Sequence, residues 1–464
     1  MLQIRMRTSR ILKLVFTIFL LTLFLGIIGY EIAEFNISYN INDSVQIQSA
    51  KYIVYKSGTT YYAKSGETGR IVYRGSNAAA VIQLAINGLT SGRTSKEKIL
   101  LQGDFTLTAT IKMESYMILE LDGKVTLGNS AGVNMLTATS KTNFEIKGGE
   151  WDGNRANQGT LVFEGLKIIS CTDFAVEGVT VHDVKGNNIS IISASRATVT
   201  NCVSYNADGS GIGLVFTSDS KATNNTVHHC SSGIYLFCEA DGVIQRCERN
   251  TISGNLVYVI SHDGISLYPE GGEDIIQWNT ITNNTTYDCG IDGEHVGIAI
   301  GWNGGPRIPE VGSVHYNNCT DNLIYYTGAY VCDIGMLVKG TNNTVARNII
   351  NNTYASAMFI IGENNIIQDN SIAKTRNLGS FGIGLYLANN TYVKENSLLN
   401  IYNDAIWIST NSNNNKIENN YVDTAGGYWL VIDAADCDNN IVYKNFYYNT
   451  KGILDNGSNT IYMP

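Results

Sequence analysis

Apolar and polar residues alternate in short runs along most of this chain, and these runs recur. Several begin with a small residue followed by alternating aliphatic positions: Gly211–Leu214, Gly233–Leu236, Gly264–Leu267, Gly297–Ile300, Gly382–Leu385 and Ala405–Ile408. A period of two is typical of β-strands, whereas an amphipathic helix would place apolar residues three and four positions apart, which no segment after residue 140 does. The pattern predicts short strands and excludes an α-helical repeat.

Asparagines mark the same repeat. Ten of them are each followed two places on by an apolar residue, mostly 22 to 26 residues apart: Asn201, Asn225, Asn255, Asn279, Asn322, Asn348, Asn370, Asn396, Asn420 and Asn445. Short strands at this period cannot bury their apolar side chains alone, so the copies must stack into a solenoid. Asparagine suits one fixed turn position, because it tolerates left-handed backbone and its amide can bond the asparagine of the next coil. We therefore predict an all-β, single-stranded parallel β-helix.

The chain divides into three parts. Residues 1–30 place four basic side chains ahead of an uncharged apolar run over residues 14–30, which predicts a signal peptide or, because no convincing cleavage site follows, an uncleaved signal anchor. The N-terminus would then be cytoplasmic and the remainder extracellular, attached to the membrane. Residues 31–75 predict an extracellular spacer with lead-in strands. The β-helix follows over residues 76–464, and its first segment, 76–88, predicts a cap helix with Ser76 or Asn77 as N-cap.

Charge and cysteine content narrow the function classes. The net charge is −9 and no basic cluster occurs beyond the first 13 residues, which argues against a nucleic-acid partner. The nine cysteines of an exported chain would permit disulfides, with Cys238–Cys247 and Cys289–Cys319 as candidate bridges. The alternative is that the cysteines are buried thiols that fill interior positions.

Three segments near the start of the repeat carry a family resemblance. They are the helix at 76–88, the strand end Gln102-Gly103-Asp104-Phe105 and the sequence Gly148-Gly149-Glu150-Trp151-Asp152-Gly153-Asn154. Together they resemble the opening of the right-handed β-helix proteins of the pectin-lyase-like superfamily, which includes polygalacturonases and pectate lyases. The asparagine-rich half also resembles NosD-type carbohydrate-binding and sugar-hydrolase repeats. The resemblance implies a right-handed solenoid that acts on or binds polysaccharide. Of the polygalacturonase aspartate motifs only the first has a counterpart, at Asn206–Gly209.

Candidate chemistry gathers in the middle coils. All six histidines lie between residues 182 and 315, and the spacing of the asparagines widens to 30 residues after Asn225 and to 43 after Asn279. Long loops on a rigid scaffold commonly carry binding and catalytic residues. We therefore predict a polysaccharide groove across residues 201–340.

Alignment of the glycine-led runs predicts which side chains meet in that groove. His262 and Asp263 should stack near Glu294 and His295, with His229 one coil before. Coils stack about 4.8 Å apart, so carboxylates would approach to about 5 Å on adjacent coils and about 10 Å on alternate coils. Asp263 with Glu294 or Asp292 would make the close pair, and Asp208 with Asp263 the wide pair of an inverting hydrolase.

A lyase reaction on a uronic acid would use the same residues differently. His262 or His295 would be the base, and Arg246, Arg249 or Lys339 would face the substrate carboxylate. A Ca²⁺ ion held by Asp263, Asp292 and Glu294 would serve the same purpose. Trp302 would stack on a sugar ring. The leading hypothesis is thus a cell-surface polysaccharide lyase or glycoside hydrolase. Its alternatives are a non-catalytic sugar-binding or adhesion rod and a metal site at His229, His262 and His295.

Overall fold

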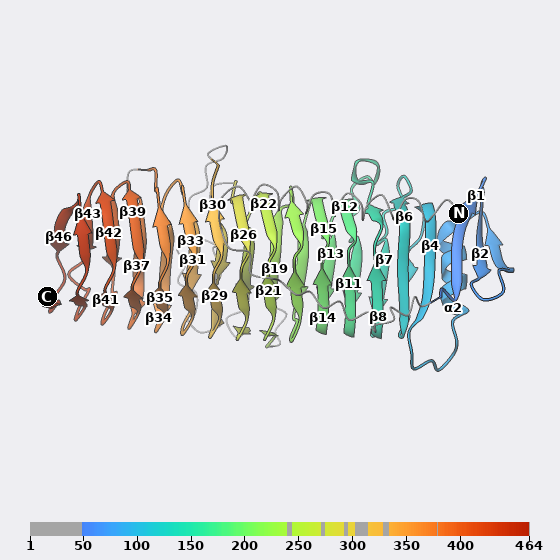
Figure 1. Ribbon diagram of the computed structural model, residues 1–464, viewed down its shortest axis with the longest axis horizontal. Coiled ribbons are helices and arrows are strands. Elements are labelled where there is room, and N and C mark those ends of the chain that lie inside the picture. Colours follow the sequence, from blue (N-terminus) through green and yellow to red (C-terminus); the bar gives the residue numbers. More distant parts are fainter. Residues whose placement is uncertain are drawn as a thin grey trace, which may run out of the picture. The chain divides into compact units, whose positions relative to one another are not determined.

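Parallel strands stacked coil upon coil make up the protein. The computed structural model describes residues 49–463 except 239–243, 271–273, 292–295, 302–313, 328–333 and 378. The strands form a 30-stranded sheet, a 14-stranded sheet and a 3-stranded sheet. Figure 1 shows the coils side by side in sequence order, with the colour changing steadily along the stack. The predicted parallel β-helix is confirmed.

Each coil contributes strands to three columns, two in the 30-stranded sheet and one that is the 14-stranded sheet. Strands β4 (Glu97–Leu107) and β6 (Met117–Leu127) span both columns of the large sheet. The first column continues with β8 (Thr142–Lys147), β11 (Thr172–Glu177), β14 (Ser195–Thr200), β17 (Lys221–Thr223), β21 (Thr251–Ser253), β25 (Thr280–Thr282), β29 (Asn318–Thr320), β32 (Thr344–Ala346), β35 (Ile366–Gln368), β38 (Tyr392–Lys394), β41 (Lys416–Glu418), β44 (Ile441–Tyr443) and β47 (Ile461–Met463). The second column holds β9 (Glu150–Asp152), β12 (Thr180–Val184), β15 (Val203–Ala207), β18 (Thr226–His228), β22 (Leu256–Ile260), β26 (Thr285–Cys289), β30 (Leu323–Tyr325), β33 (Ile349–Asn351), β36 (Ser371–Ala373), β39 (Ser397–Ile401), β42 (Tyr421–Ala425) and β45 (Phe446–Tyr448).

The third column is the 14-stranded sheet. Its strands are β5 (Ile111–Lys112), β7 (Leu136–Thr139), β10 (Leu166–Ile169), β13 (Ile189–Ile192), β16 (Ser210–Val215), β19 (Ser232–Cys238), β23 (Ile265–Pro269), β27 (Val296–Ile300), β31 (Ile334–Lys339), β34 (Met358–Glu363), β37 (Phe381–Asn389), β40 (Asp404–Ser409), β43 (Tyr428–Ile432) and β46 (Lys451–Asp455). The 3-stranded sheet holds β20 (Arg246–Glu248), β24 (Ile275–Gln277) and β28 (Val314–His315). Inward side chains of all the columns share one continuous apolar core.

The small residue that opens each glycine-led run is explained by close stacking. A Cβ atom at Gly233 would lie 2.1 Å from the carbonyl oxygen of Gly264, and one at Gly264 would lie 2.6 Å from that of Gly297. The same contact recurs two coils later, where a Cβ at Gly335 would lie 2.8 Å from the carbonyl oxygen of Ala357. Glycine at these positions therefore lets successive coils approach.

Two asparagine ladders, rather than one, hold the coils together. Their members are Asn225, Asn255, Asn284, Asn322, Asn348, Asn370, Asn396, Asn420 and Asn445 in the first, and Asn250, Asn279, Asn317, Asn343, Asn365, Asn415 and Asn440 in the second. The predicted single ladder is therefore wrong in two places. Asn279 belongs to the second ladder, and Asn201 is exposed while Cys202 occupies the ladder position, its backbone N–H donating to Asn225 Oδ1 at 2.9 Å.

The left-handed turn residue and the ladder asparagine are also distinct. Asn224 and Asn283 have φ of 56° and are exposed, whereas the ladder members Asn225 and Asn284 directly follow them and are buried. The expectation that one asparagine fills both roles is wrong. The turn residue bends the chain outward to solvent, and the next residue then points inward to bond the neighbouring coils.

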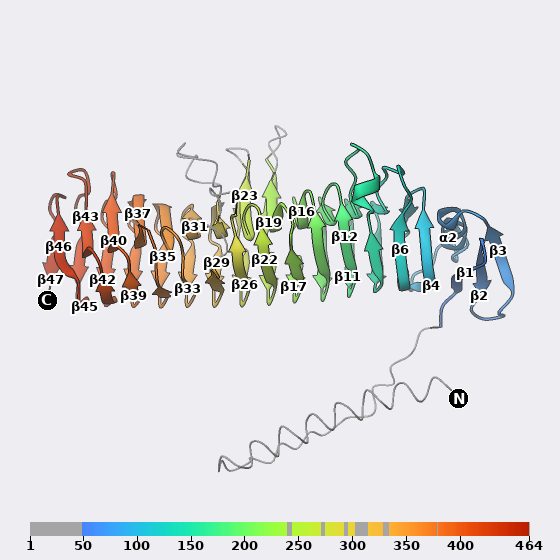
Figure 2. The same cartoon turned by 90° about the horizontal axis from the view of Figure 1, so that it is seen from above.

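The start of the solenoid is covered by local structure. Strands β1 (Tyr52–Ser57), β2 (Thr60–Ser65) and β3 (Ile71–Gly75) form an antiparallel meander, and β1 pairs in parallel with β4, so the first coil has no bare edge there. Helix α2 (Ala78–Asn87) confirms the predicted helix, with Asn77 as the N-cap: its side chain accepts a hydrogen bond from the backbone N–H of Ala80 at 3.0 Å. Figure 2 shows α2 beside β1 to β3, and its apolar face joins the core.

The predicted signal segment at residues 14–30 lies outside the described residues. In the part of the chain that the structure does describe, no helix has the length and apolar character needed to cross a membrane.

The described cysteines are buried thiols. The sulfur atoms of Cys238 and Cys247 lie 3.4 Å apart, so this predicted pair is adjacent but unbonded. The predicted Cys289–Cys319 bridge is wrong, because Cys289 ends β26 in the second column whereas Cys319 lies in β29 in the first.

Candidate functional site

A hollow of about 380 Å³ opens on the turns that lead from the second column to the 14-stranded sheet. Its lining comes from successive coils and comprises Arg155, Ala207, Asp208, His229, Cys230, Ser231, Val259, Ser261 and Ile291. Arg155 begins the short helix η1 (Arg155–Asn157), and most of the other residues follow strands β15, β18, β22 and β26. The hollow therefore runs across several coils of the solenoid.

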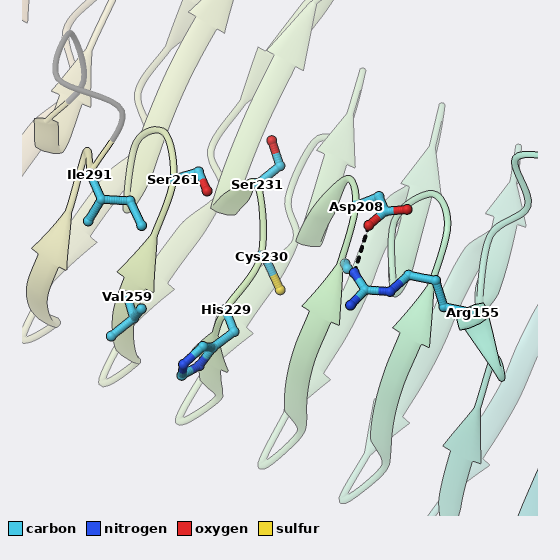
Figure 3. A pocket seen from close by; sticks show the side chains of 9 residues that line it. Arg155, Asp208, His229, Cys230, Ser231, Val259, Ser261 and Ile291 are labelled. Atoms are coloured by element: carbon cyan, nitrogen blue, oxygen red, sulfur yellow. Dashed lines mark hydrogen bonds and ion pairs between the residues drawn. The ribbon is translucent and has the colours of Figure 1, made fainter.

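An ion pair stands at one end of the hollow. Figure 3 shows the side chains of Arg155 and Asp208 pointing toward each other, and Arg155 Nη1 lies 2.6 Å from Asp208 Oδ1. The side chain of Asp208 is 51% exposed, so its carboxylate is able to accept further hydrogen bonds from a bound molecule. Since both groups are largely solvated, the pair itself contributes little stability.

Imidazole and hydroxyl groups line the middle of the hollow. His229 is exposed, and its Nδ1 lies 2.8 Å from Nδ1 of His228. One of these two nitrogens must therefore carry a hydrogen and donate a hydrogen bond to the other. Ser231 Oγ lies 3.2 Å from His262 Nδ1. The hollow thus offers groups that both donate and accept hydrogen bonds.

The backbone at the hollow is strained. His229 has φ of 53° and Val259 has φ of 52°, both at the left-handed position of this turn. Other coils place asparagine or aspartate there, as at Asn206 and Asp288. A β-branched residue is disfavoured in this conformation, and such strain tends to persist at functional sites.

A stack of aromatic rings runs along the second column and contacts His229 of the hollow through His228 and Tyr258. Ring centroids of consecutive members lie 4.6 to 5.1 Å apart in the series His182, Tyr205, His228, Tyr258, Tyr287 and Tyr325. Each ring covers the face of the next, so the stack presents ring edges rather than faces. It is a rigid wall and offers no flat surface to a ligand.

One member of this stack makes stability depend on pH. Burial, followed by the neighbouring His229, lowers the pKa of His228 from its ordinary value of 6.5. The folded state therefore binds fewer protons than the unfolded chain below about pH 6.5, and the stability contributed by neutral His228 is lost as the pH falls toward the lowered pKa.

We expect His228→Tyr to reduce this acid sensitivity. Tyrosine occupies the same position in both neighbouring coils, at Tyr205 and Tyr258, so the stack is preserved. In thermal denaturation, the fall in midpoint between about pH 7.5 and about pH 5.5 should be smaller in the variant than in the wild type. An identical fall in both proteins would show that His228 does not contribute.

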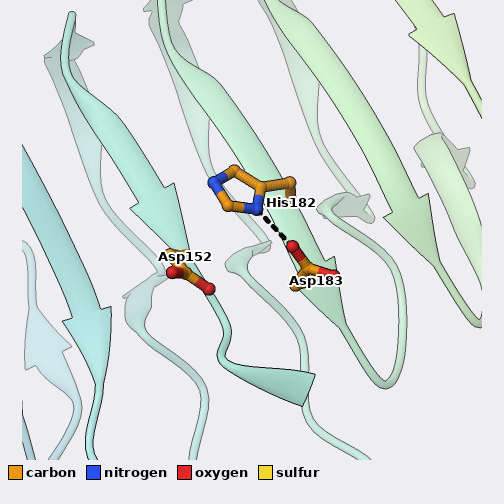
Figure 4. Close-up of side chains that lie close together, drawn as sticks. All are labelled: Asp152, His182 and Asp183. Atoms are coloured by element: carbon orange, nitrogen blue, oxygen red, sulfur yellow. Dashed lines mark hydrogen bonds and ion pairs between the residues drawn. The ribbon is translucent and has the colours of Figure 1, made fainter. Parts of the chain in front are cut away.

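A second group of ionisable side chains lies one turn away from the hollow. Ligand atoms of Asp152, His182 and Asp183 lie within 4.8 Å of one another (Figure 4). However, Lys124 Nζ already lies 2.9 Å from Asp152 and 2.8 Å from Glu150, and these hydrogen bonds raise the pKa of Lys124. Both ring nitrogens of His182 are also engaged, by Asp183 at 2.6 Å and Glu150 at 3.1 Å. The group is a satisfied ion-pair network, and we assign no metal to it.

The structure separates the residues predicted for catalysis. Asp208 lines the hollow, and His262 contacts Ser231 at its edge. Asp263 is only 9% exposed, and its Oδ1 accepts a hydrogen bond from the backbone N–H of Val296 at 3.0 Å. Asp263 is not among the lining residues of the hollow, and the wide Asp208–Asp263 pair stays a prediction. Asp292, Glu294, His295 and Trp302 lie outside the described residues, and the predicted close pair, Ca²⁺ shell and sugar platform stay predictions.

The alignment that predicted these contacts is confirmed in the strands. Ile265 pairs with Ile298 as expected, yet the backbone N–H of Gly290 donates to the carbonyl of His262 at 2.8 Å. The described partner of His262 in the next coil is therefore Gly290, and four more residues stand between Cys289 and Gly297 than between Ile260 and Gly264. In the preceding coil His262 pairs with Ser231, whereas His229 pairs with Val259.

The predicted cationic residues lie away from the hollow. Arg246 begins β20 and pairs with Glu248 at 2.9 Å. Arg249 pairs with Asp219 at 2.7 Å and with Glu248. Lys339 ends β31 and is buried, which lowers its pKa. None of the three is a lining residue.

Sequence reasoning missed Arg155, Ser231, Val259 and Ser261. Ser231 and Ser261 precede the glycine-led runs at Gly233 and Gly264, so their proximity follows from the repeat, but a serine in a turn carries no chemical signal of its own. Nothing in the sequence pointed to Arg155 as the partner of Asp208, because the two residues are 53 positions apart in the chain.

Comparisons with known proteins agree with this fold. The profile of the family described as "Right handed beta helix region" matches residues 131–309 and 312–463. No curated protein matches the sequence. Among solved structures, the tailspike protein of E. coli bacteriophage HK620, in complex with a pentasaccharide, superposes with a TM-score of 0.52 at 12% identity, covering 81% of this chain and 76% of the tailspike. A periplasmic alginate epimerase gives 0.50 at 12% identity, covering 75% of this chain and 78% of the epimerase.

A third structure, the A-module of a mannuronan C-5 epimerase from Azotobacter vinelandii, gives a TM-score of 0.45 at 14% identity, with coverage of 84% and 96%. At these identities the structural neighbours report on the fold alone. The family profile covers well over half of the sequence, so this chain belongs to the right-handed β-helix family.

Proposed function

We propose that this protein binds polysaccharide in the hollow between Arg155 and Ile291, with the carboxylate of Asp208 as the main hydrogen-bond acceptor. The observation that carries the proposal is the composition of the hollow. It joins a half-exposed carboxylate, held in place by Arg155, to the hydroxyls of Ser231 and Ser261 on successive coils. Sugar chains present hydroxyl donors and acceptors at regular intervals, so a row of polar groups that repeats with each coil is suited to them.

The apolar lining supports the same ligand class. Ala207, Val259 and Ile291 place aliphatic surface between the polar groups. The C–H faces of sugar rings pack against such surface while their hydroxyls bond the flanking side chains. Two structural neighbours are named as an alginate epimerase and as a tailspike bound to a pentasaccharide, which supports a glycan ligand for a scaffold of this kind. Export through the predicted signal segment would bring this protein to cell-surface polysaccharide.

For catalysis, the described residues favour elimination over hydrolysis. Hydrolysis by two carboxylates needs a second acid facing Asp208, and Asp263 is instead buried against Val296. Elimination from a uronic acid breaks the C5–H and C4–O bonds and forms a C4–C5 double bond. It needs a base that takes the C5 proton and can return it to the departing oxygen, and a cation beside the carboxylate. The exposed imidazole of His229 would be the base, and Arg155 would face the substrate carboxylate. A non-catalytic binding rod is the alternative, and product analysis separates the two.

Binding should depend on Asp208. We expect Asp208→Asn to weaken binding of the recognised polysaccharide at least about tenfold, because a charge-assisted hydrogen bond contributes about 1.5 to 3 kcal/mol. The measurement is calorimetric titration with a panel of acidic and neutral polysaccharides, and mass spectrometry of the products. Unsaturated ends would establish elimination, saturated ends hydrolysis, and an intact panel binding alone.

A matched control is available in the same protein. Asp321 pairs with Arg347 of the adjacent coil at 2.7 Å, another solvent-accessible Asp–Arg pair, but it lies on the turn between the first and second columns. Asp321→Asn should bind like the wild type. Equal affinity of the wild type and Asp208→Asn would reject the hollow as the binding site.

A further inference from the structure

Two large aromatic side chains stand exposed on another turn of the solenoid. Trp278 directly follows β24 and Tyr316 directly follows β28, and each is 50% exposed. Their preceding residues, Gln277 and His315, pair in register. The two aromatic residues therefore lie on adjacent coils, about 4.8 Å apart along the solenoid.

Both residues hold an unfavourable backbone conformation. Trp278 and Tyr316 each have φ of 56°, at a turn position that the later coils fill with asparagine, as at Asn342 and Asn364. Asparagine is tolerated there, whereas a bulky aromatic residue is an outlier. Burial does not compensate for the strain, because half of each side chain faces solvent. Exposed side chains that break a local rule of this kind are expected at functional positions.

The face of Trp278 is available to a ligand. The rings of the stack from His182 to Tyr325 cover one another, but no ring of the described residues stacks on Trp278. Tyr316 makes a perpendicular contact with His315, at 5.3 Å between centroids. The stack from His182 to Tyr325 exposes ring edges, whereas this turn exposes flat aromatic surface to solvent.

The turn is rigid and its surroundings are electrically balanced. Asn279 directly follows Trp278, and Asn317 directly follows Tyr316. The backbone N–H of Asn279 donates to Asn317 Oδ1 at 2.9 Å, and its side-chain amide donates to the same oxygen at 3.0 Å.

In the preceding coil Arg246 and Arg249 are paired with Glu248, and Arg249 also with Asp219. Two cations and two anions leave no net charge, which favours an uncharged ligand over an acidic one.

We propose that Trp278 and Tyr316 form a platform on which an uncharged stretch of glycan stacks its sugar rings. Hexose rings present a flat C–H face of about the size of an indole ring, and aromatic residues with one exposed face are suited to such amphipathic surfaces. The ligand class rests on the proposed polysaccharide function. The site itself is independent of the hollow, since the two share no residue and lie on different turns.

Trp278→Asn tests the platform without endangering the fold, because asparagine is the residue that later coils use at this position. In the full-length protein we expect this variant to unfold at the same temperature as the wild type or higher. It should bind neutral oligosaccharides, with cello-, malto- and chito-oligosaccharides as probes, at least about tenfold more weakly in calorimetric titration. Trp278→Phe, which keeps a flat ring, should bind within about threefold of the wild type. Tyr316→Asn should also weaken binding.

The same titrations distinguish the platform from the hollow. Asp321→Asn, which lies outside both sites, should bind the neutral probes as the wild type does, and Trp278→Asn should retain the binding that depends on Asp208. Unchanged affinity in both Trp278→Asn and Tyr316→Asn would overturn the platform and leave the hollow intact. A wild-type protein that binds none of the neutral probes would also overturn it.

Discussion

Asn284→Ala is expected to lower the free energy of unfolding by about 2 to 5 kcal/mol, because it leaves buried polar groups without partners. Asn284 Oδ1 accepts hydrogen bonds from both the backbone N–H and the side-chain amide of Asn255, at 3.0 and 2.9 Å. Its own amide donates to the carbonyl of Ile252 at 2.9 Å. Alanine would remove these three bonds and the one that the amide donates to Asn322 Oδ1 at 3.0 Å, all in the buried interior. Urea denaturation followed by circular dichroism measures the loss.

The adjacent residue is the control. Asn283 is exposed, has φ of 56°, and makes one long side-chain bond of 3.3 Å to Thr282. Glycine adopts this conformation freely, so Asn283→Gly should cost less than about 1 kcal/mol. Comparable losses in the two variants would mean that the ladder contributes no more than any turn residue.

Gly233→Ala should be at least as damaging, with an expected loss of about 3 kcal/mol or more. The added Cβ would lie 2.1 Å from the carbonyl oxygen of Gly264 and 2.6 Å from Cγ1 of Val257. A backbone carbonyl inside a stacked sheet cannot move without displacing the coil to which it belongs. Gly233 follows Ser231 and Ser232, so any shift of this coil also moves the lining of the hollow.

Gly452→Ala provides the comparison. Gly452 is the second residue of β46, as Gly233 is of β19, and both strands belong to the 14-stranded sheet. A Cβ at Gly452 would meet no atom within 4 Å. Gly452→Ala should therefore be neutral or slightly stabilising, by up to about 1 kcal/mol. Thermal denaturation of both variants separates the effect of coil contact from that of adding a methyl group, and equal midpoints would refute the steric explanation.

The fold could be predicted from the sequence because the features that specify it repeat in many coils. Alternating strands, small residues at a fixed offset and regularly spaced asparagines each occur many times, so an error at one coil does not alter the conclusion. The helix at Ala78–Asn87 was likewise predictable, since its N-cap at Asn77 and its apolar face are local features. The errors concern detail of register, as with Asn201 and Asn279, where adjacent asparagines serve different purposes in the same turn.

The candidate site could be predicted only in part, because its residues do not repeat from coil to coil. Asp208 was predictable because Asn206–Gly209 resembles the first polygalacturonase aspartate motif, but its partner Arg155 comes from a helix that belongs to no repeat. The expected contact of His262 with Glu294 and His295 assumed equal turn lengths. The turn after Cys289 is longer than the turn after Ile260, and the backbone of Gly290 is the described neighbour of His262 in that coil, so the contact with Glu294 and His295 stays a prediction.

The sequence by itself determined the solenoid, because the period-two strands and small residues of one coil can bury their apolar faces only against copies of themselves. Tertiary structure alone decided which side chains share the hollow and which aromatic rings keep a free face. Those neighbours lie a whole coil apart in the chain, and a change of a few residues in one turn moves every side chain of that turn relative to the next coil.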